Sequence, residues 1–284
     1  LFCEPASHYL DMHALQAAVG LAHVIVAIIC TPCYIRIIYA SLRLKFKIGI
    51  VQCLMAPGFL FLGFAHITGA DPWNIASLAM SIGVSAARTE AILSLVLACN
   101  RLRIICELKY PTAFHTVLLV AAWAFGLVYN AILFTPFSGF VVVPGNFLPK
   151  YDMTLPWTAI FTRIGSSLIL MTSSLNLLVY LVIILFLFNT RRQMKFSRNS
   201  SKERTILLYA IIRFLGDVCL TVIYNFVGLA RSHEAQFVVM IGYELNNLFL
   251  PPLLYLVLNR SLRMECLCKS IEMTSVVAIS TARL

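Results

Sequence analysis

Seven apolar stretches divide the chain, and each is long enough to cross a lipid bilayer as a helix. A helix needs roughly 20 apolar residues to span about 30 Å of hydrocarbon, whereas a membrane-spanning strand needs only about ten. The stretches predict an all-α membrane protein, a bundle of seven transmembrane helices at residues 14–39, 48–68, 75–105, 113–134, 157–188, 205–230 and 235–258. The composition excludes a water-soluble domain, because only 12% of the 284 residues are charged, which is about half the usual share.

The two sides of the predicted bundle carry unequal charge. Seventeen of the 22 Lys and Arg residues lie in or beside the loops after the first, third, fifth and seventh stretches, together with four acidic residues. The other side carries two basic and five acidic residues. Loops rich in Lys and Arg stay in the cytoplasm, so the N-terminus is predicted outside and the C-terminus inside. Contact with anionic membrane lipid then accounts for the basic excess, and no nucleic-acid partner is predicted.

Charged side chains within the predicted spans are few, and ionisable groups in a membrane usually mark a working site. They are Arg88, Glu90, Arg163, Arg213, Asp217 and Glu244. Arg213 and Asp217 are four residues apart, which predicts an ion pair along one helix face, with contact to a ligand as the other interpretation. Glu90 precedes Arg101 by eleven residues, about three helical turns, so both should face the bundle interior. Arg88 lies about 200° around the helix from Glu90 and needs a partner elsewhere.

Three classes of activity suit a bundle of this kind: a ligand-operated switch coupled to a cytoplasmic partner, a transporter or channel, and an intramembrane enzyme. An enzyme would need paired aspartates, a nucleophile with its base, or clustered histidines. His23 is the only histidine deep within a predicted span, and no HExxH or HxxxH pattern occurs. The sequence therefore predicts no enzymatic activity, no cofactor and no metal site. A transporter usually has repeated halves with broken helices, and the seven unequal stretches argue against one.

Short motifs at the inner ends of two stretches resemble those of rhodopsin-like G-protein-coupled receptors. Asn100-Arg101-Leu102 is similar to their Asp-Arg-Tyr motif, and Pro251-Pro252-Leu253-Leu254-Tyr255 is similar to their Asn-Pro-x-x-Tyr motif. The segments 90–101, 134–136 and 252–263 resemble the nematode serpentine receptor family, most closely serpentine receptor class T. The disulfide cysteines of rhodopsin-like receptors and the proline of their sixth helix have no counterpart here, which indicates a divergent receptor.

This resemblance implies a chemosensory G-protein-coupled receptor in the plasma membrane of sensory-neuron cilia, with a heterotrimeric G protein as its partner. A receptor domain at 1–268 would hold the seven spans and a short amphipathic eighth helix at 260–268, followed by a cytoplasmic tail at 269–284. Arg101 would contact the G protein or an inner tyrosine, and its other interpretation is one more basic residue that sets the topology. The residues implied at this switch are Asn100, Arg101, Tyr180, Pro252, Tyr255, Arg191 and Arg192, with Tyr180 or Tyr255 as the tyrosine.

The ligand-facing residues also follow from the resemblance, because helices three, five and seven bound the pocket in the receptor fold. The candidates for contact with an unknown small molecule are Glu90, Arg163 and Glu244, with Arg88 as a fourth, and the other interpretation is a buried polar network. Cys266 and Cys268 closely follow the seventh stretch, which suits S-palmitoylation as well as ordinary reduced cysteines. The alternative to a receptor is a seven-span ligand-gated cation channel or small-solute transporter. Insect odorant receptors are such channels, and their N-terminus lies inside.

Overall fold

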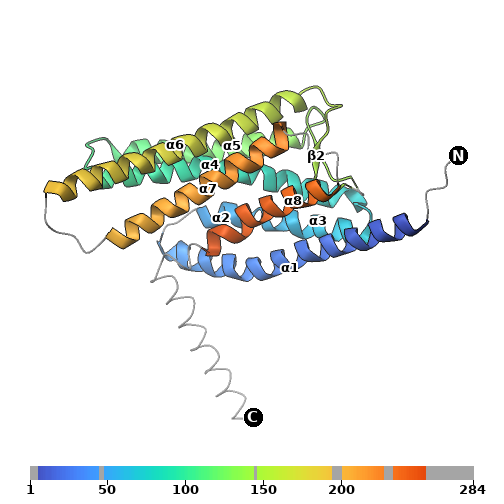
Figure 1. The fold of residues 1–284 in the computed structure, drawn as a ribbon. Helices are drawn as coiled ribbons and strands as arrows, with labels where there is room; N and C mark the ends of the chain where they lie inside the picture. The colour runs from blue at the N-terminus through green and yellow to red at the C-terminus, as the bar shows by residue number, and fades with distance from the viewer. Residues whose placement is uncertain (1–5, 45–47, 144–145, 194–199, 227–232, 254–284) are drawn as a thin grey trace, which may run out of the picture.

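The structure is a computed structural model, and it describes every residue except 1–5, 45–47, 144–145, 194–199, 227–232 and 254–284. Its long helices lie side by side along a common direction (Figure 1). Helices cover all seven predicted stretches as far as the structure describes them. They are α1 (Ala6–Leu44), α2 (Ile48–Cys53) with α3 (Ala56–Thr68), α4 (Ile75–Ile105), α5 (Thr112–Leu133), α6 (Thr158–Gln193), α7 (Ser200–Phe226) and α8 (His233–Glu244). A short 3-10 helix, η1 (Pro72–Asn74), precedes α4, and a π-helical segment, η3 (Leu245–Phe249), continues α8.

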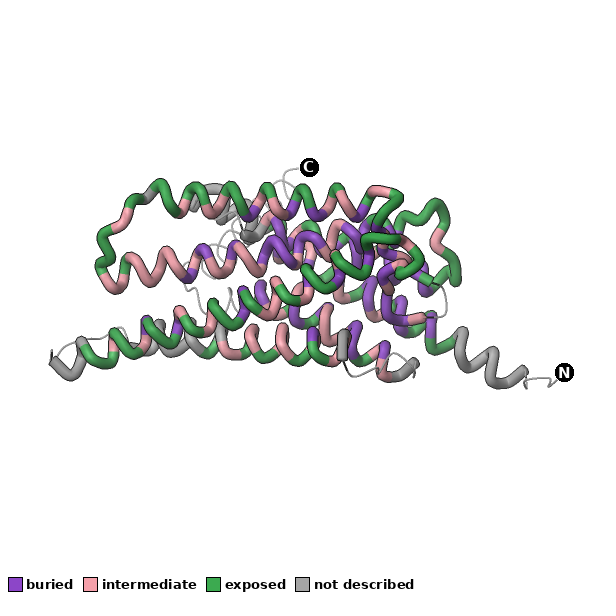
Figure 2. The backbone as a smooth tube through the Cα atoms, turned by 90° about the horizontal axis from the view of Figure 1, so that it is seen from above, coloured by how far each residue is buried: buried purple, intermediate pink, exposed green. Residues whose placement is uncertain are grey.

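The apolar character of the helices identifies a membrane protein. Five segments of the described chain are long and apolar enough to cross a membrane: Ala14–Ile35, Ile50–Thr68, Pro72–Ile105, Ala113–Leu133 and Thr158–Asn189. Buried positions gather in one half of the bundle, while the outward faces of the helices are exposed (Figure 2). Those outward faces are largely apolar, as Leu21, Ile25 and Ile28 on α1 illustrate. An apolar surface of this extent is typical of contact with lipid.

Glycines let two of the membrane helices approach closely. A Cβ atom at Gly20 of α1 would lie 2.5 Å from the carbonyl oxygen of Gly63 on α3, and a Cβ atom at Gly63 would lie 2.7 Å from the carbonyl oxygen of Gly20. Without side chains at these positions the two backbones meet directly, which is the usual way that membrane helices pack.

The second predicted stretch is interrupted between α2 and α3. Pro57 has no N–H to donate to the carbonyl of Cys53, four residues earlier, so the α-helical pattern cannot continue through it. The chain tightens at the interruption, where the Met55 N–H donates to the carbonyl of Gln52 (3.2 Å). This turn brings Met55 to the wall of the cavity described below.

The loop between α5 and α6 folds into a hairpin, which the all-α prediction did not include. Strand β1 (Phe140–Val141) pairs antiparallel with β2 (Lys150–Tyr151). The Val142 N–H donates to Ser77 Oγ at the start of α4 (2.9 Å). Ser77 donates in turn to Asp71 (2.7 Å), whose carboxylate also accepts two N–H groups of the first turn and so caps α4. The hairpin thus covers one end of the bundle, the hairpin end, on the side of the N-terminus (Figure 1).

Several predicted features lie outside the described residues. They are Tyr255, Cys266, Cys268, the eighth helix at 260–268 and the tail at 269–284. Arg191 and Arg192 belong to the last turn of α6, but their side chains also lie outside the described part of the structure. Each of these stays a prediction.

Candidate functional site

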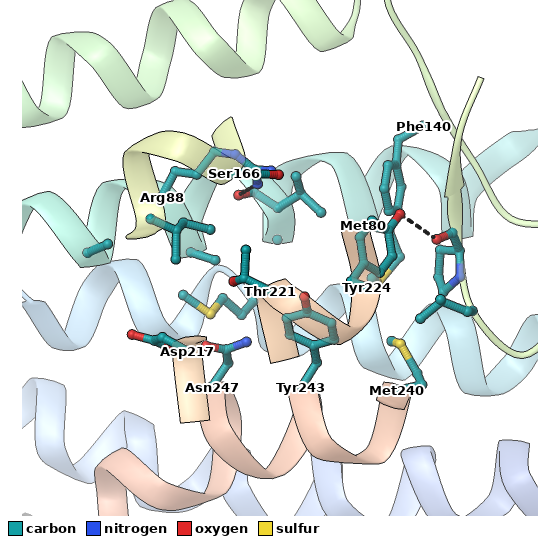
Figure 3. Close-up of a pocket in the computed structure, with 18 of the residues that line it drawn as sticks. Met80, Arg88, Phe140, Ser166, Asp217, Thr221, Tyr224, Met240, Tyr243 and Asn247 are labelled. Atoms are coloured by element: carbon teal, nitrogen blue, oxygen red, sulfur yellow. Dashed lines mark hydrogen bonds between the residues drawn. The ribbon is translucent and has the colours of Figure 1, made fainter. Parts of the chain in front are cut away.

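A cavity of about 130 Å³ lies between the helices, beside the hairpin (Figure 3). Its walls come from α3, α4, α6, α7, α8 and η3, and residues of the hairpin cover it. Much of its lining is apolar and includes Phe59, Met80, Val84, Phe140, Leu148 and Met240. One water molecule needs roughly 10–15 Å³, so the cavity has room for a small organic molecule.

Arg88 is a buried cation in the wall of this cavity, with 6% of its surface exposed. Its Nη1 donates to the carbonyl of Val84 (2.7 Å), and its Nη2 donates to the hydroxyl of Tyr151 on β2 (2.6 Å). Its guanidinium carbon lies 4.8 Å from the centre of the Tyr129 ring on α5, which is a cation–π contact. Its Nε is buried and has no hydrogen-bond partner in the structure. The three groups that contact the guanidinium are therefore uncharged.

A glycine on α6 makes the space that Arg88 occupies. A Cβ atom at Gly165 would lie 2.2 Å from Nε of Arg88 and 2.8 Å from the hydroxyl oxygen of Tyr129. Both distances are shorter than atoms in contact allow, so any larger residue would displace the guanidinium. Gly165 therefore determines where the charge of Arg88 lies.

On the α7 side of the cavity, one arginine pairs with two carboxylates. Arg213 forms ion pairs with Glu90 on α4 (Nη2 to Oε2, 2.9 Å) and with Asp217 on its own helix (Nε to Oδ1, 3.5 Å). Glu90 is 1% exposed and also accepts from Nε2 of Gln52 on α2 (2.7 Å). The predicted pair between Arg213 and Asp217 is confirmed, and it extends across the bundle to Glu90. One network of charges and amides thus joins α2, α4 and α7.

The π-helical segment η3 supplies further partners to this network. Oδ1 of Asn247 accepts from Nη2 of Arg213 (3.0 Å), and the carbonyl of Asn246 accepts from Nη1 of Arg213. Nδ2 of Asn246 donates to Oδ1 of Asp217 (2.8 Å). The hydroxyl of Tyr34 on α1 donates to another backbone carbonyl of the segment (2.8 Å). A π-helical turn displaces carbonyls from the α-helical pattern, and such turns are frequent at functional sites.

The candidate ligand-facing residues are not brought together as a set, because only Arg88 of the four lines the cavity. Glu244 faces α1, where its Oε2 lies 2.7 Å from Nδ1 of His23. Arg163 is exposed and does not line the cavity. Glu90 does not line the cavity and is paired with Arg213. Ligand contact by Glu90, Arg163 and Glu244 therefore stays a prediction, while the contacts of Glu90 match the alternative interpretation, a buried polar network.

The other end of α4 carries the predicted switch. Nη1 of Arg101 donates to the hydroxyl of Tyr180 on α6 (3.0 Å), and Tyr180 is itself buried. The contact between Arg101 and one of its two predicted tyrosines is confirmed, while its role in coupling stays a prediction. Asn100 is half-buried, and Pro252 is buried in the helical turn that follows η3.

The turn after β2 is closed by Asp152 and Thr154. The carboxylate of Asp152 accepts from the N–H (3.0 Å) and the hydroxyl (2.5 Å) of Thr154. These two hydrogen bonds hold the pKa of the Asp152 carboxyl below its usual range. The carboxylate therefore stays ionised at neutral pH, and the turn keeps its hydrogen bonds.

Some residues of the site were not found from the sequence. Gln52, His23 and Asn246 are polar side chains within apolar stretches, and this alone could have marked them as members of a buried network. Tyr151 gave no such signal, because it reaches Arg88 only through the hairpin. Among the described residues, no group of three or more His, Cys, Asp and Glu side chains is placed to hold a metal ion.

Comparison of the chain with models of protein families found no match, and comparison with curated protein sequences found none either. The likeness to serpentine receptors therefore rests on the short motifs in the sequence.

Proposed function

We propose that the protein is a chemosensory receptor of seven transmembrane helices, with its N-terminus outside, in the plasma membrane of sensory cilia. It binds a small external molecule in the cavity and activates a cytoplasmic heterotrimeric G protein. The five apolar spans, together with the helices α7 and α8, support a bundle of seven. The excess of Lys and Arg in and beside the loops after the first, third, fifth and seventh stretches supports the orientation.

The observation that carries this proposal is a cavity between helices, two of which, α4 and α7, are joined by a buried ion pair. Ligand sites are usually concave and apolar, with a few polar groups that orient the ligand. Here the polar groups include Arg88 on α4 and Thr221 and Tyr224 on α7. A ligand that contacts both helices binds one arrangement of them better than another, and this difference in affinity shifts the population.

In the proposed mechanism, α4 transmits the effect of ligand binding from the cavity to the cytoplasmic end of the bundle. Arg88 and Arg101 lie thirteen residues apart on this helix, which is about 20 Å along its axis. Movement of α7 against α4 would alter the pair between Arg213 and Glu90 in the middle of the bundle. Rearrangement of the Arg101–Tyr180 contact would then expose the surface that meets the G protein.

The test compares Arg101→Ala with Arg103→Ala, the neighbouring basic residue at the same end of α4. Each full-length variant is expressed with a G protein and exposed to a panel of small organic molecules, and GTP exchange and surface expression are measured. We expect Arg101→Ala to lose the response at normal surface expression, while Arg103→Ala keeps it. If Arg101 served only to set the topology, the two variants would behave alike. A ligand-evoked current in cells without usable G proteins would favour the channel alternative.

A further inference from the structure

We propose that the cavity binds a small organic carboxylate with an apolar body, and that the carboxylate pairs with the guanidinium of Arg88. This inference rests on the proposed function only in taking the cavity as the ligand site. It names the chemical class of the ligand.

The first ground is that Arg88 lacks an acidic partner, although it is a buried cation. The acids of the described helices in the bundle interior are already engaged: Glu90 and Asp217 pair with Arg213, and Glu244 lies against His23. None of the ion pairs in the described part of the chain includes Arg88. A buried charge without a counter-charge is unfavourable, so an anion in the cavity would complete the site.

The second ground is the number of hydrogen bonds that Arg88 leaves unmade. A guanidinium has five N–H donors in a fixed planar arrangement that fits the two oxygens of a carboxylate. Two of them donate, one to the carbonyl of Val84 and one to the hydroxyl of Tyr151, and the buried Nε has no partner. The remaining donors can therefore bind an anion while Val84 and Tyr151 hold the side chain in position.

The rest of the cavity lining favours a ligand whose remaining part is apolar. Side chains such as Phe59, Met80 and Met240 offer apolar contact to a hydrocarbon chain or ring rather than to an inorganic ion. The acidic side of the cavity offers little to an amine, because both oxygens of Asp217 are occupied. Oδ1 accepts from Asn246 and pairs with Arg213, and Oδ2 accepts from Ser173 (3.0 Å). The cavity therefore favours an anionic ligand over a cationic one.

The test measures binding directly and needs no G protein. Full-length protein in lipid nanodiscs is titrated with hexanoate, hexanamide, hexylamine and sodium chloride, and the dissociation constants and unfolding midpoints are recorded. Wild type should bind hexanoate more tightly than the other three. Arg88→Gln should weaken hexanoate binding by roughly tenfold to a hundredfold, the usual size of hydrogen bonds to a charged group. Arg103→Gln is the matched control, an arginine on the same helix that does not line the cavity, and should bind hexanoate as wild type does.

Two further variants keep the proposal testable if Arg88→Gln does not fold. Arg88→Lys keeps the charge but loses the planar arrangement of donors, so it should bind hexanoate with an intermediate affinity. Tyr151→Phe removes one of the two groups that hold the guanidinium in position, so it should weaken the binding of hexanoate less than Arg88→Gln does.

Failure of wild type to bind hexanoate, or equal binding of hexanoate and hexylamine, would overturn the assignment. So would equal binding of chloride, which would indicate an inorganic anion site. None of these outcomes would contradict the proposed receptor function, which is tested separately through GTP exchange.

Discussion

Arg88 and Arg213 are arginines beside the same cavity, yet their surroundings differ. Arg213 is neutralised by Glu90 and Asp217, whereas Arg88 contacts a carbonyl, a hydroxyl and an aromatic ring. Arg213 therefore belongs to the packing of the helices, and Arg88 is available to an external partner. At one cavity, Arg213 thus stabilises the structure and Arg88 is free to recognise a ligand.

At Glu90, we expect Glu90→Gln to lower stability and to raise ligand-free activity. The amide can still bond to Gln52, but the ion pair that joins α4 to α7 is lost, at a cost of about 1–3 kcal/mol. The unfolding midpoint of the purified protein and GTP exchange without ligand measure the two effects. Glu107→Gln is the control, because Glu107 is an exposed acid at the end of α4. Unchanged values for Glu90→Gln would show that the pair does not hold the resting arrangement.

At Gly165, substitution by alanine should destabilise the protein by about 1–3 kcal/mol and displace Arg88, because the new methyl group has no room. Gly83→Ala on α4 is the matched control. Its Cβ atom would lie 3.8 Å from the nearest atom, so the better helix propensity of alanine should raise stability slightly. Thermal unfolding of both variants measures the two changes in stability. A Gly165→Ala variant as stable as Gly83→Ala would contradict the close contact.

At the scale of elements, the sequence predicted helices better than it predicted their interruptions and contacts. The stretch 75–105 coincides with α4, because long apolar runs in a membrane can satisfy their backbone only as helices. The pair Arg213–Asp217 was predictable because its spacing is local. The partnership of Glu90 with Arg213 was not, because it depends on the depth and rotation of two helices. The hairpin was missed because its strands have two residues each, too few for an alternating pattern.

The attachment of the hairpin to α4 gives a further prediction. Ser77→Ala removes the acceptor of the buried Val142 N–H and the hydroxyl that donates to Asp71. Loss of a partner for a buried group costs about 1–3 kcal/mol, so the backbone amides of β1 and β2 should exchange with deuterium faster. Ser81→Ala is the control, because the hydroxyl of Ser81 bonds within its own helix. Equal exchange in both variants would mean that Ser77 does not secure the hairpin.

For the whole molecule, function depends on which end of the bundle faces outward. The cavity lies beside the hairpin, and the Arg101–Tyr180 contact lies toward the opposite end of the bundle, the end that the sequence predicts to be cytoplasmic. A molecule outside the cell can reach the cavity, and a G protein can reach Arg101, only if the hairpin end is external. The proposed receptor therefore requires an external N-terminus and a cytoplasmic C-terminus.

Epitope tags on the two termini, stained in intact and in permeabilised cells, measure this orientation directly. We predict that the N-terminal tag is stained in intact cells and that the C-terminal tag is stained only after permeabilisation. The reverse pattern would place the cavity on the cytoplasmic side, contradict the receptor and favour the channel or transporter.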